Sequence, residues 1–425
     1  MNQPTSFAPL NEAAQRFLLR EQHGLFIDGQ QTSAASNKTF ETRDPSTGKV
    51  LGHLAEGGDE DIDRAVRAAR AAFTGPWSRW TPYERQALLH RAHDIMERHF
   101  DELAEIESMD MGAPISRMRG AKDSVLKMIQ FFAAQTGNIA GETLQNGLPG
   151  DVVTMSMKAP VGIVGGIIPW NGPLISQWWI LGTILASGCT TVLKPAEDAS
   201  LSVLRVVELL HEVGLPSGVV NVVTGMGAVA GAALARHPGV DRIAFTGSTE
   251  TGRKIIEAST TNIKKLQLEL GGKSPDIIFA DADLDKAVPG AAMGVFANSG
   301  QICFAGTRVL VQRPIVNEFC ARVAEFARAI RVGRSLDVDA TRQRRLGHLR
   351  HAMPLKYLWS RSRVDPLLVG FGGTKHSGYG EEAMTLGNQT EYQQVCLHQH
   401  VMSTTPRGSK ILHDTMTGQH HLASP

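Results

Sequence analysis

The stretch VGIVGGIIPWNGPLISQWWILGTILASGCTTVLK, residues 161–194, decides the fold. No charged residue occurs from Ala159 to Leu193, and such a length is enough to span a bilayer. Prolines at positions 160, 169 and 173 interrupt its first half, however, and would leave backbone groups that lipid cannot satisfy. We therefore expect a buried strand, a loop and a buried helix that begins at Pro173, and no membrane span.

Strand and helix patterns alternate after this stretch. The strand CTTVLK (189–194) is followed by a helix over Leu201 to Val213, the strand GVVNVV (218–223), a helix after Gly227 and the strand RIAFTG (242–247). This order predicts βαβ crossovers and a parallel, doubly wound sheet of the α/β class.

A second alternation begins after Glu269. The segment SPDIIFA (274–280) precedes a helix from Asp283 through Ser299, and TRVLVQ (307–312) precedes a helix from Val316 to Ile330. These elements predict a second α/β domain.

Before the central stretch, LFIDGQ (25–30) and TFETRDPSTGKVLG (39–52) predict short strands around turn residues. A helix follows with Asp59 as its cap and a stripe of Ile62, Val66, Ala69 and Phe73. Two strand-like segments between residues 141 and 158, joined by Gly-Leu-Pro-Gly, predict a projecting hairpin.

Composition excludes several classes of partner. The 425 residues carry 43 Lys plus Arg against 42 Asp plus Glu, a formal net charge of +1, which does not favour binding to nucleic acid or an anionic membrane. The four cysteines show no close spacing typical of a metal site or disulfide framework, and the N-terminus lacks a secretory signal. We expect a cytoplasmic protein of two or three domains without a bound metal.

Two residues have side chains suited to covalent catalysis. Cys303, in GQICFAGTR, fits either a reactive thiolate in a loop or a small buried hydrophobe, and burial is the better reading of the cysteine alone. Glu269, just before a Gly-Gly pair, fits either a general base or a solvated glutamate at a strand end, and its local sequence alone favours the second.

Asn171 and two glycine-containing turns are candidates for binding. The Asn171 amide, between a strand and a helix, suits either an oxyanion donor or a helix cap. Gly225 to Ala230 matches a loose dinucleotide fingerprint, while FTGSTETG (245–252) offers Ser248 and helix N–H groups to a phosphate. Glu197, in LKPAED, offers a carboxylate to a ribose.

Taken together, these motifs resemble the NAD(P)-dependent aldehyde dehydrogenase superfamily. Five segments occur in the order and spacing of this superfamily: PWN, LKPAED, FTGSTETG, LELGGKSP and GQICFAGTR. The similarity runs from about Phe26 to Asp339 and reappears in FGGTKHSGYG at 371–380. The resemblance implies that Cys303 is the nucleophile, Asn171 an oxyanion donor and Glu269 the base that activates water. It also implies a small-molecule aldehyde as substrate.

The resemblance further implies the cofactor site. The expected contacts are Ile168, Pro169, Trp170, Lys194, Glu197, Gly227, Phe245, Thr246, Gly247, Ser248 and Leu270. Lys194 and Glu197 resemble the ribose-binding pair and Ser248 the phosphate contact. A carboxylate at position 197 should repel a 2′-phosphate, so NAD is expected rather than NADP.

Pocket positions suggest the kind of aldehyde. Gly172 stands where relatives often carry an aromatic residue, and Trp178, Trp179, Ile302 and Phe304 resemble pocket or near-pocket positions. We therefore expect a roomy apolar pocket for an aromatic or branched aldehyde.

The resemblance also divides the chain into domains. It implies a variant Rossmann NAD-binding domain over 24–140 and 160–269, oligomerisation strands over 141–159 and 384–398, a shortened α/β catalytic domain over 270–383 and an irregular tail over 399–425. The oligomerisation strands imply a homodimer or homotetramer.

One region departs from the family pattern. Phe371 follows Cys303 by 68 residues, less than half the spacing in full-length relatives, and the basic run from Arg342 to Arg363 matches no family element. We interpret this as an internal deletion or a reading-frame change. The alternatives to an active dehydrogenase are an inactive NAD-binding or oligomer-forming remnant and a thiol ester hydrolase that needs no NAD.

Overall fold

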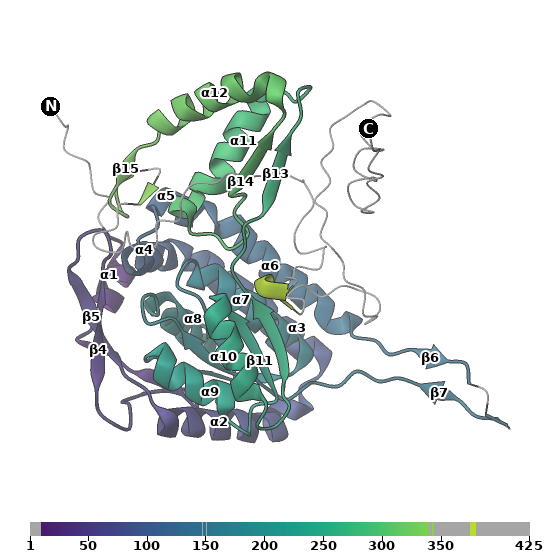
Figure 1. The fold of residues 1–425 in the computed structure, drawn as a ribbon. Helices are drawn as coiled ribbons and strands as arrows, with labels where there is room; N and C mark the ends of the chain where they lie inside the picture. The colour runs from purple at the N-terminus through teal and green to yellow at the C-terminus, as the bar shows by residue number, and fades with distance from the viewer. Residues whose placement is uncertain are drawn as a thin grey trace. The chain divides into compact units, whose positions relative to one another are not determined.

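The computed structural model describes residues 10–146, 148–149, 151–338, 340, 342–343 and 375–379. Most of the basic run, the expected strand over 384–398 and the tail over 399–425 lie outside these residues. The described chain groups into a large unit, up to Gly272 with segments after Arg331, and a small unit over Lys273–Ile330 (Figure 1).

The large unit is built on the predicted parallel sheet. Its strand order is β17-β12-β11-β8-β9-β10-β2-β3, in which β12 to β10 run parallel and the flanking β17, β2 and β3 run antiparallel to their neighbours. The strands are β8 (Ile163–Ile168), β9 (Thr190–Pro195), β10 (Val220–Val222), β11 (Arg242–Thr246), β12 (Lys265–Glu269), β17 (Gly378–Tyr379), β2 (Leu25–Ile27) and β3 (Gln30–Thr32). The doubly wound α/β fold is therefore confirmed, with antiparallel strands added at both edges.

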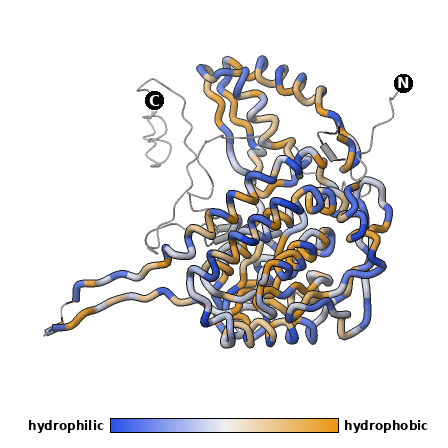
Figure 2. The backbone as a smooth tube through the Cα atoms, turned by 180° about the vertical axis from the view of Figure 1, so that it is seen from behind, coloured by the Kyte–Doolittle hydropathy of each residue, from blue (hydrophilic) through white to orange (hydrophobic). Residues whose placement is uncertain are grey.

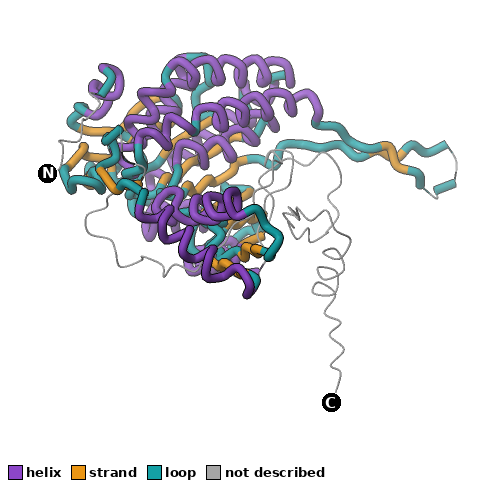
Figure 3. The backbone as a smooth tube through the Cα atoms, turned by 90° about the horizontal axis from the view of Figure 1, so that it is seen from above, coloured by secondary structure: helices purple, strands orange, loops and turns teal. Residues whose placement is uncertain are grey.

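Helices cover both faces of this sheet, because alternate strand residues point to opposite sides. Val164 and Leu193 pack into one core cluster, whereas their neighbours Ile163 and Val192 pack into another. The first face carries α1 (Glu12–Leu18), α3 (Pro82–Arg98), α4 (Phe100–Met111), α5 (Ile115–Gly120), α6 (Lys122–Gln135), α7 (Pro173–Ser187) and α8 (Leu201–Glu212). The second carries α2 (Asp59–Thr74), α9 (Ala232–Arg236) and α10 (Thr249–Ser259), and the strands lie between helices in Figure 3.

Shorter elements complete the large unit. They are β1 (Gln22–His23), β4 (Thr39–Arg43), β5 (Val50–Ala55), η1 (Pro76–Arg79), η2 (Thr136–Asn138), β6 (Thr143–Leu144), β7 (Thr154–Met155), η3 (Gly227–Gly231), β15 (Val332–Gly333), β16 (Arg342–Gln343) and η7 (Lys375–Ser377). Strands β6 and β7 pair antiparallel, which confirms the hairpin, and Figure 1 shows it projecting from the unit.

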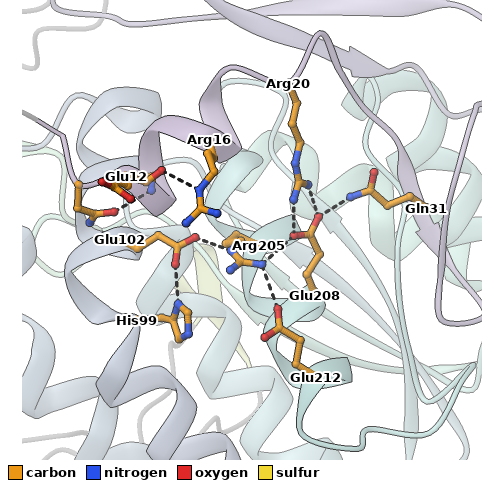
Figure 4. A network of polar contacts seen from close by, with 11 residues as sticks. Glu12, Arg16, Arg20, Gln31, His99, Glu102, Arg205, Glu208 and Glu212 are labelled. Atoms are coloured by element: carbon orange, nitrogen blue, oxygen red, sulfur yellow. Dashed lines mark hydrogen bonds and ion pairs between the residues drawn. The ribbon is translucent and has the colours of Figure 1, made fainter.

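A polar network joins the helices on the first face to the N-terminal segment (Figure 4). Arg205 of α8 donates from Nε to Glu102 Oε1 of α4 at 2.5 Å and from Nη1 to Glu208 at 3.0 Å. Glu208 in turn accepts from both terminal nitrogens of Arg20, at 2.5 and 3.1 Å. The side chain of Arg205 is only 13% exposed, so these bonds are screened less than surface pairs and fix α8 to α4.

The small unit contains β13 (Pro275–Ile278), α11 (Leu284–Phe296), η4 (Ala297–Gly300), β14 (Arg308–Val311), η5 (Arg313–Ile315) and α12 (Val316–Arg328). Strands β13 and β14 pair in parallel and both helices pack on them through a core that includes Ile278, Val288 and Phe319, which confirms a second α/β unit.

Two details of the helix predictions are wrong. Asp59 is the first residue of α2 rather than its cap; the carboxylate of Asp61 instead accepts from the Gly58 N–H at 3.1 Å. The helix expected through Ser299 ends at Phe296, because Asn298 and Ser299 adopt left-handed backbone angles, with φ of 49° and 56°. A right-handed helix cannot continue through such residues.

Apolar residues concentrate inside the large unit, as the hydropathy colours of Figure 2 show for its central strands. The buried helix predicted from Pro173 is α7, which includes the wholly buried Leu181 and Leu185. Among the helices of the described residues, none has both the length and the apolar character needed for a membrane span.

Candidate functional site

The expected cofactor residues of the large unit gather at one edge of the sheet. Ile168 ends β8, Glu269 ends β12, and the segments around residues 197, 227 and 247 follow β9, β10 and β11. Parallel strands bring these ends to the same edge, and the register pairs Ile168 with Pro195 and Thr246 with Glu269. The connection after β8 leads to β9, whereas β11 lies on the other side of β8. Such a switch point is where open α/β sheets bind ligands.

Lys194 and Glu197 form an ion pair at this edge. The ammonium Nζ lies 2.8 Å from Glu197 Oε2, and Lys194 is only 2% exposed. Burial lowers the pKa of Lys194, although the Glu197 carboxylate opposes that shift. Burial is the largest single effect on Glu197 and opposes its ionisation, but the charge and hydrogen bond of Lys194 together with backbone hydrogen bonds, among them that of Gly227, outweigh it and lower the pKa of Glu197. The Glu197 carboxylate is therefore charged near neutral pH.

Gly227 leaves the space beside this pair open. Its N–H donates to Glu197 Oε1 at 3.2 Å, and a Cβ added there would stand 3.6 Å from both carboxylate oxygens and 3.8 Å from Lys194 Nζ. A side chain at position 227 would thus project toward the pair. The helix expected after Gly227 begins at that residue, as the π-helical η3 that runs into α9.

The FTGSTETG turn opens α10. Ser248 is the N-cap: its Oγ accepts from the Thr251 N–H at 3.1 Å and contacts Thr251 Oγ1 at 2.9 Å. A Cβ at Gly247 would meet the Phe245 ring at 2.4 Å, so only glycine fits there without a shift. A helix N-terminus with a free approach along a glycine backbone suits a phosphate.

Asn171 lies in the turn between β8 and α7 and is partly buried. It is not the helix cap, because the N-cap residue is Gly172 and has no side chain to bond. The Leu174 N–H in the first turn of α7 instead donates to Glu107 Oε2 at 2.9 Å. The helix-cap reading of Asn171 therefore fails at the N-cap position, which Gly172 occupies.

Glu269 is buried, with 5% of its surface exposed, so the reading of a solvated strand-end glutamate is wrong. Its carbonyl accepts from the Gly247 N–H at 2.9 Å, and β17 pairs with it from the other side at Gly378. Between β11 and β17, the backbone of Glu269 is held at the same sheet edge as the Lys194 pair.

Cys303 lies in the small unit, in a turn before β14, and is partly exposed. Cys303 is therefore not the small buried hydrophobe that the cysteine alone suggested; that description fits Cys189, which is 4% exposed. The turn is preceded by Asn298 and Gln301, whose side-chain amides each donate to the other's backbone carbonyl, at 3.1 and 2.9 Å. Sequence reasoning missed this pair, although Asn-Ser-Gly at 298–300 is a turn signal.

The expected pocket residues have different environments. Gly172 lines a cavity of about 140 Å³ with residues of α4, α5 and α6. Trp178 is wholly buried in the core, Trp179 is partly buried, and in the small unit Ile302 is partly buried and Phe304 is 61% exposed.

The cavity also contains two charged residues that sequence reasoning did not identify, Glu107 and Arg117. Burial raises the pKa of Glu107 to about 7, and that of its neighbour Asp110 to about 6. Nothing in the local sequence distinguishes these acids from the other acids of α4, since their burial comes from packing against α7 and α8.

A family model, relatives of known sequence and solved structures all match this chain to the same family. A model of the aldehyde dehydrogenase family matches residues 32–353. An aldehyde dehydrogenase of Emericella nidulans is 40% identical over 358 residues, which cover 84% of this chain and 71% of the relative. The mitochondrial aldehyde dehydrogenase of Sus scrofa is 43% identical over 370 residues, covering 86% and 70%. The solved NAD+ complex of an aldehyde dehydrogenase from Bacillus cereus has a TM-score of 0.78 at 40% identity, covering 81% of this chain and 70% of that one.

Proposed function

The chain belongs to the aldehyde dehydrogenase family, and on that premise we propose that it oxidises an aldehyde to a carboxylic acid with NAD as hydride acceptor. The observation that carries the proposal is the gathering of the Lys194–Glu197 pair, the Gly247–Ser248 turn and the buried Glu269 at one edge of a doubly wound sheet. NAD is also the cofactor in the solved complex of the Bacillus cereus relative.

The residues at this edge fit a dinucleotide. Glu197 and Lys194 would hold the adenosine ribose, since a carboxylate accepts from its hydroxyls, and glycine at position 227 puts no side chain beside the pair. Ser248 and the N-terminus of α10 would hold a phosphate. The other proposed contacts, Ile168, Pro169, Trp170, Phe245, Thr246 and Leu270, belong to the ends of β8, β11 and β12. When bound, NAD supplies the acceptor for the hydride.

The proposed chemistry begins with Cys303. Its thiolate adds to the aldehyde carbonyl to form a thiohemiacetal, and the Asn171 amide and the Cys303 N–H donate to the oxyanion. After the hydride has left, Cys303 holds the acyl group as a thioester. The turn stabilised by Asn298 and Gln301 would position the sulfur.

Glu269 is proposed to complete the cycle. Its carboxylate takes a proton from water, the resulting hydroxide attacks the thioester, and the carboxylic acid leaves as the Cys303 thiol is regenerated. This role needs a carboxylate away from bulk solvent, which the burial of Glu269 supports.

We propose that the NAD-binding domain comprises 24–140 and 160–269, that a shortened catalytic domain covers 270–383, and that the hairpin over 141–159 forms dimers or tetramers. The hairpin exposes Val153, Met155 and Met157, at 73%, 62% and 84%. Exposed apolar side chains in such a cluster suit a subunit contact. We place the protein in the cytoplasm, where its described cysteines would stay reduced.

The substrate is proposed to be an aromatic or branched aldehyde. Gly172, next to Asn171, has no side chain to fill the 140 Å³ cavity, and a cavity of about 150 Å³ holds a benzene ring. Aldehyde-dependent formation of NADH by the purified chain, absent in Cys303→Ala, is the direct test. Acetaldehyde turned over faster than phenylacetaldehyde would contradict the substrate assignment.

A second candidate is an NAD-binding chain without turnover. It is favoured by the coverage of only about seven tenths of the length of the relatives. Calorimetric titration with NAD and the NADH assay together identify this candidate, because it binds NAD but forms no NADH with any aldehyde.

A further inference from the structure

Segment 375–379 lies far along the chain from the strand that it borders. It contains η7 and β17, and β17 pairs antiparallel with β12 at Leu268 and Glu269. The Leu270 N–H donates to the Ser377 carbonyl at 2.9 Å, although Ser377 follows Leu270 by 107 residues. The outer edge of the backbone around Glu269 is therefore held by a segment that is distant in sequence.

Strand pairing alone gives this segment little stability. β17 has only two residues, so it contributes few of the hydrogen bonds that stabilise a sheet. The long chain between β12 and β17 adds a cost in conformational entropy when the two strands meet. A further contact beside the strand pairing would therefore stabilise the segment.

Thr249 supplies such a contact. Its Oγ1 donates to the His376 carbonyl at 2.9 Å, between residues 127 positions apart. Thr249 is the first residue of α10 and follows the N-cap Ser248, which is proposed to hold a phosphate of the cofactor. The Thr249 hydroxyl thus joins the start of α10 to the segment that borders Glu269.

The first turn of α10 also packs against Leu270. A Cβ added at Gly252 would stand 2.9 Å from the Leu270 side chain, so the helix backbone lies close to that side chain. Leu270 is 8% exposed, and its N–H is the donor to Ser377. The position of the residue after Glu269 therefore depends on α10 directly, through Gly252, and indirectly, through the segment that Thr249 holds.

We propose that Thr249 is a positioning residue for Glu269. Its hydroxyl holds segment 375–379 against β12, and the paired backbone of β12 in turn holds the Glu269 carboxylate where it can take a proton from water. The inference rests on the proposed function, because Glu269 is the proposed base of that reaction.

Hydrogen exchange tests the contact without turnover. Thr249→Val removes the hydroxyl donor and nearly keeps the shape of the side chain. Mass spectrometry of the full chain follows the peptides that contain Leu270 and residues 376–379. We expect exchange in these peptides to be about two- to tenfold faster than in the wild type, the ratio for the loss of one neutral hydrogen bond. Unchanged exchange in folded Thr249→Val would overturn the proposal.

Two further threonine variants serve as controls. Thr249→Ser keeps a hydroxyl at the same place and should exchange as the wild type does. Thr260→Val removes a hydroxyl at the other end of α10, where it donates to the Glu257 carbonyl at 2.8 Å, and should leave both peptides unchanged. Equal acceleration in Thr260→Val, or no recovery in Thr249→Ser, would refute a specific role for the Thr249 hydroxyl.

Kinetics separate a positioning role from a general loss of stability. If the chain forms NADH, the rate of NADH formation in the first turnover should stay within about twofold in Thr249→Val, because that step does not need the base. Hydrolysis of the acylated chain should slow several-fold and recover in Thr249→Ser. Rapid mixing with intact-mass detection measures both rates, and an equal fall in both, or an unchanged rate of hydrolysis, would contradict the positioning role.

Exchange also separates this inference from the function it rests on. If no aldehyde gives NADH, the proposed dehydrogenase activity fails. The comparison of wild type, Thr249→Val and Thr249→Ser by hydrogen exchange still decides whether Thr249 holds segment 375–379 beside Glu269.

Discussion

The ammonium of Lys194 lies 2.8 Å from Oε2 of Glu197, while Oε1 of the same carboxylate accepts from the Gly227 N–H. Glu197 is thus held in place by a cation on one oxygen and a backbone donor on the other. Its charge is fixed at the point where the adenosine ribose is proposed to bind.

Glu197→Gln should therefore increase the use of NADP. The amide removes the charge that repels a 2′-phosphate, and we expect the ratio of kcat/KM for NADP to that for NAD to rise by about tenfold, or 1.4 kcal/mol. Initial rates with both cofactors give the ratio. The control is Asp198→Asn, which removes an exposed charge from the next residue; an equal rise in that variant would argue against a specific role for Glu197.

Cys303 and Glu269 should differ in which step they support. Cys303→Ala is expected to abolish aldehyde-dependent NADH formation while NAD affinity stays within about twofold, because Cys303 lies outside the cofactor-binding unit. Cys320→Ala, at the exposed cysteine of α12, serves as the control. Loss of NAD binding in Cys303→Ala would show that the thiol has a structural role instead.

Glu269→Gln should slow the second half of the reaction. We expect a burst of NADH near one equivalent, followed by a steady rate lower by about 10²- to 10⁴-fold, since hydrolysis of the thioester loses its base. Rapid-mixing absorbance and intact-mass detection of the acylated chain measure both. A variant with an unchanged steady rate would exclude Glu269 as the base.

The hairpin prediction concerns assembly. Val153→Glu combined with Met155→Glu should shift the chain to a smaller species in light scattering, because burying two unpaired carboxylates in a subunit contact is unfavourable. Tyr83→Glu, at a side chain of α3 that is 79% exposed, is the control. If both variants keep the wild-type mass, the hairpin is not the contact.

The sheet could be predicted from the sequence because its strands are continuous apolar runs such as Ile163–Ile168, buried on both faces and separated by glycine and proline turns. The positions of residues 168, 197, 227, 247 and 269 at one edge follow from parallel topology. In contrast, the burial of Glu107 depends on α4 meeting α7 and α8, which are distant in sequence. Local patterns carry no information on such contacts.

Glu107→Gln should stabilise the large unit above neutral pH. The folded pKa of about 7 lies above the ordinary 4.5, chiefly through burial, so the folded state holds a proton that the unfolded state has lost between these values. Stability contributed by the protonated form is therefore present below pH 4.5 and lost as pH rises through 7, and by pH 8 the charged carboxylate costs about 3 kcal/mol. The glutamine carbonyl can still accept from Leu174 and Ser202 without carrying a charge. Urea unfolding from pH 5 to 8.5 should show that Glu107→Gln gains stability over the wild type as pH rises. The control is Glu97→Gln, at an exposed position of α3, which should show no such gain. Parallel pH profiles for the wild type and Glu107→Gln would mean that Glu107 is not kept protonated by burial.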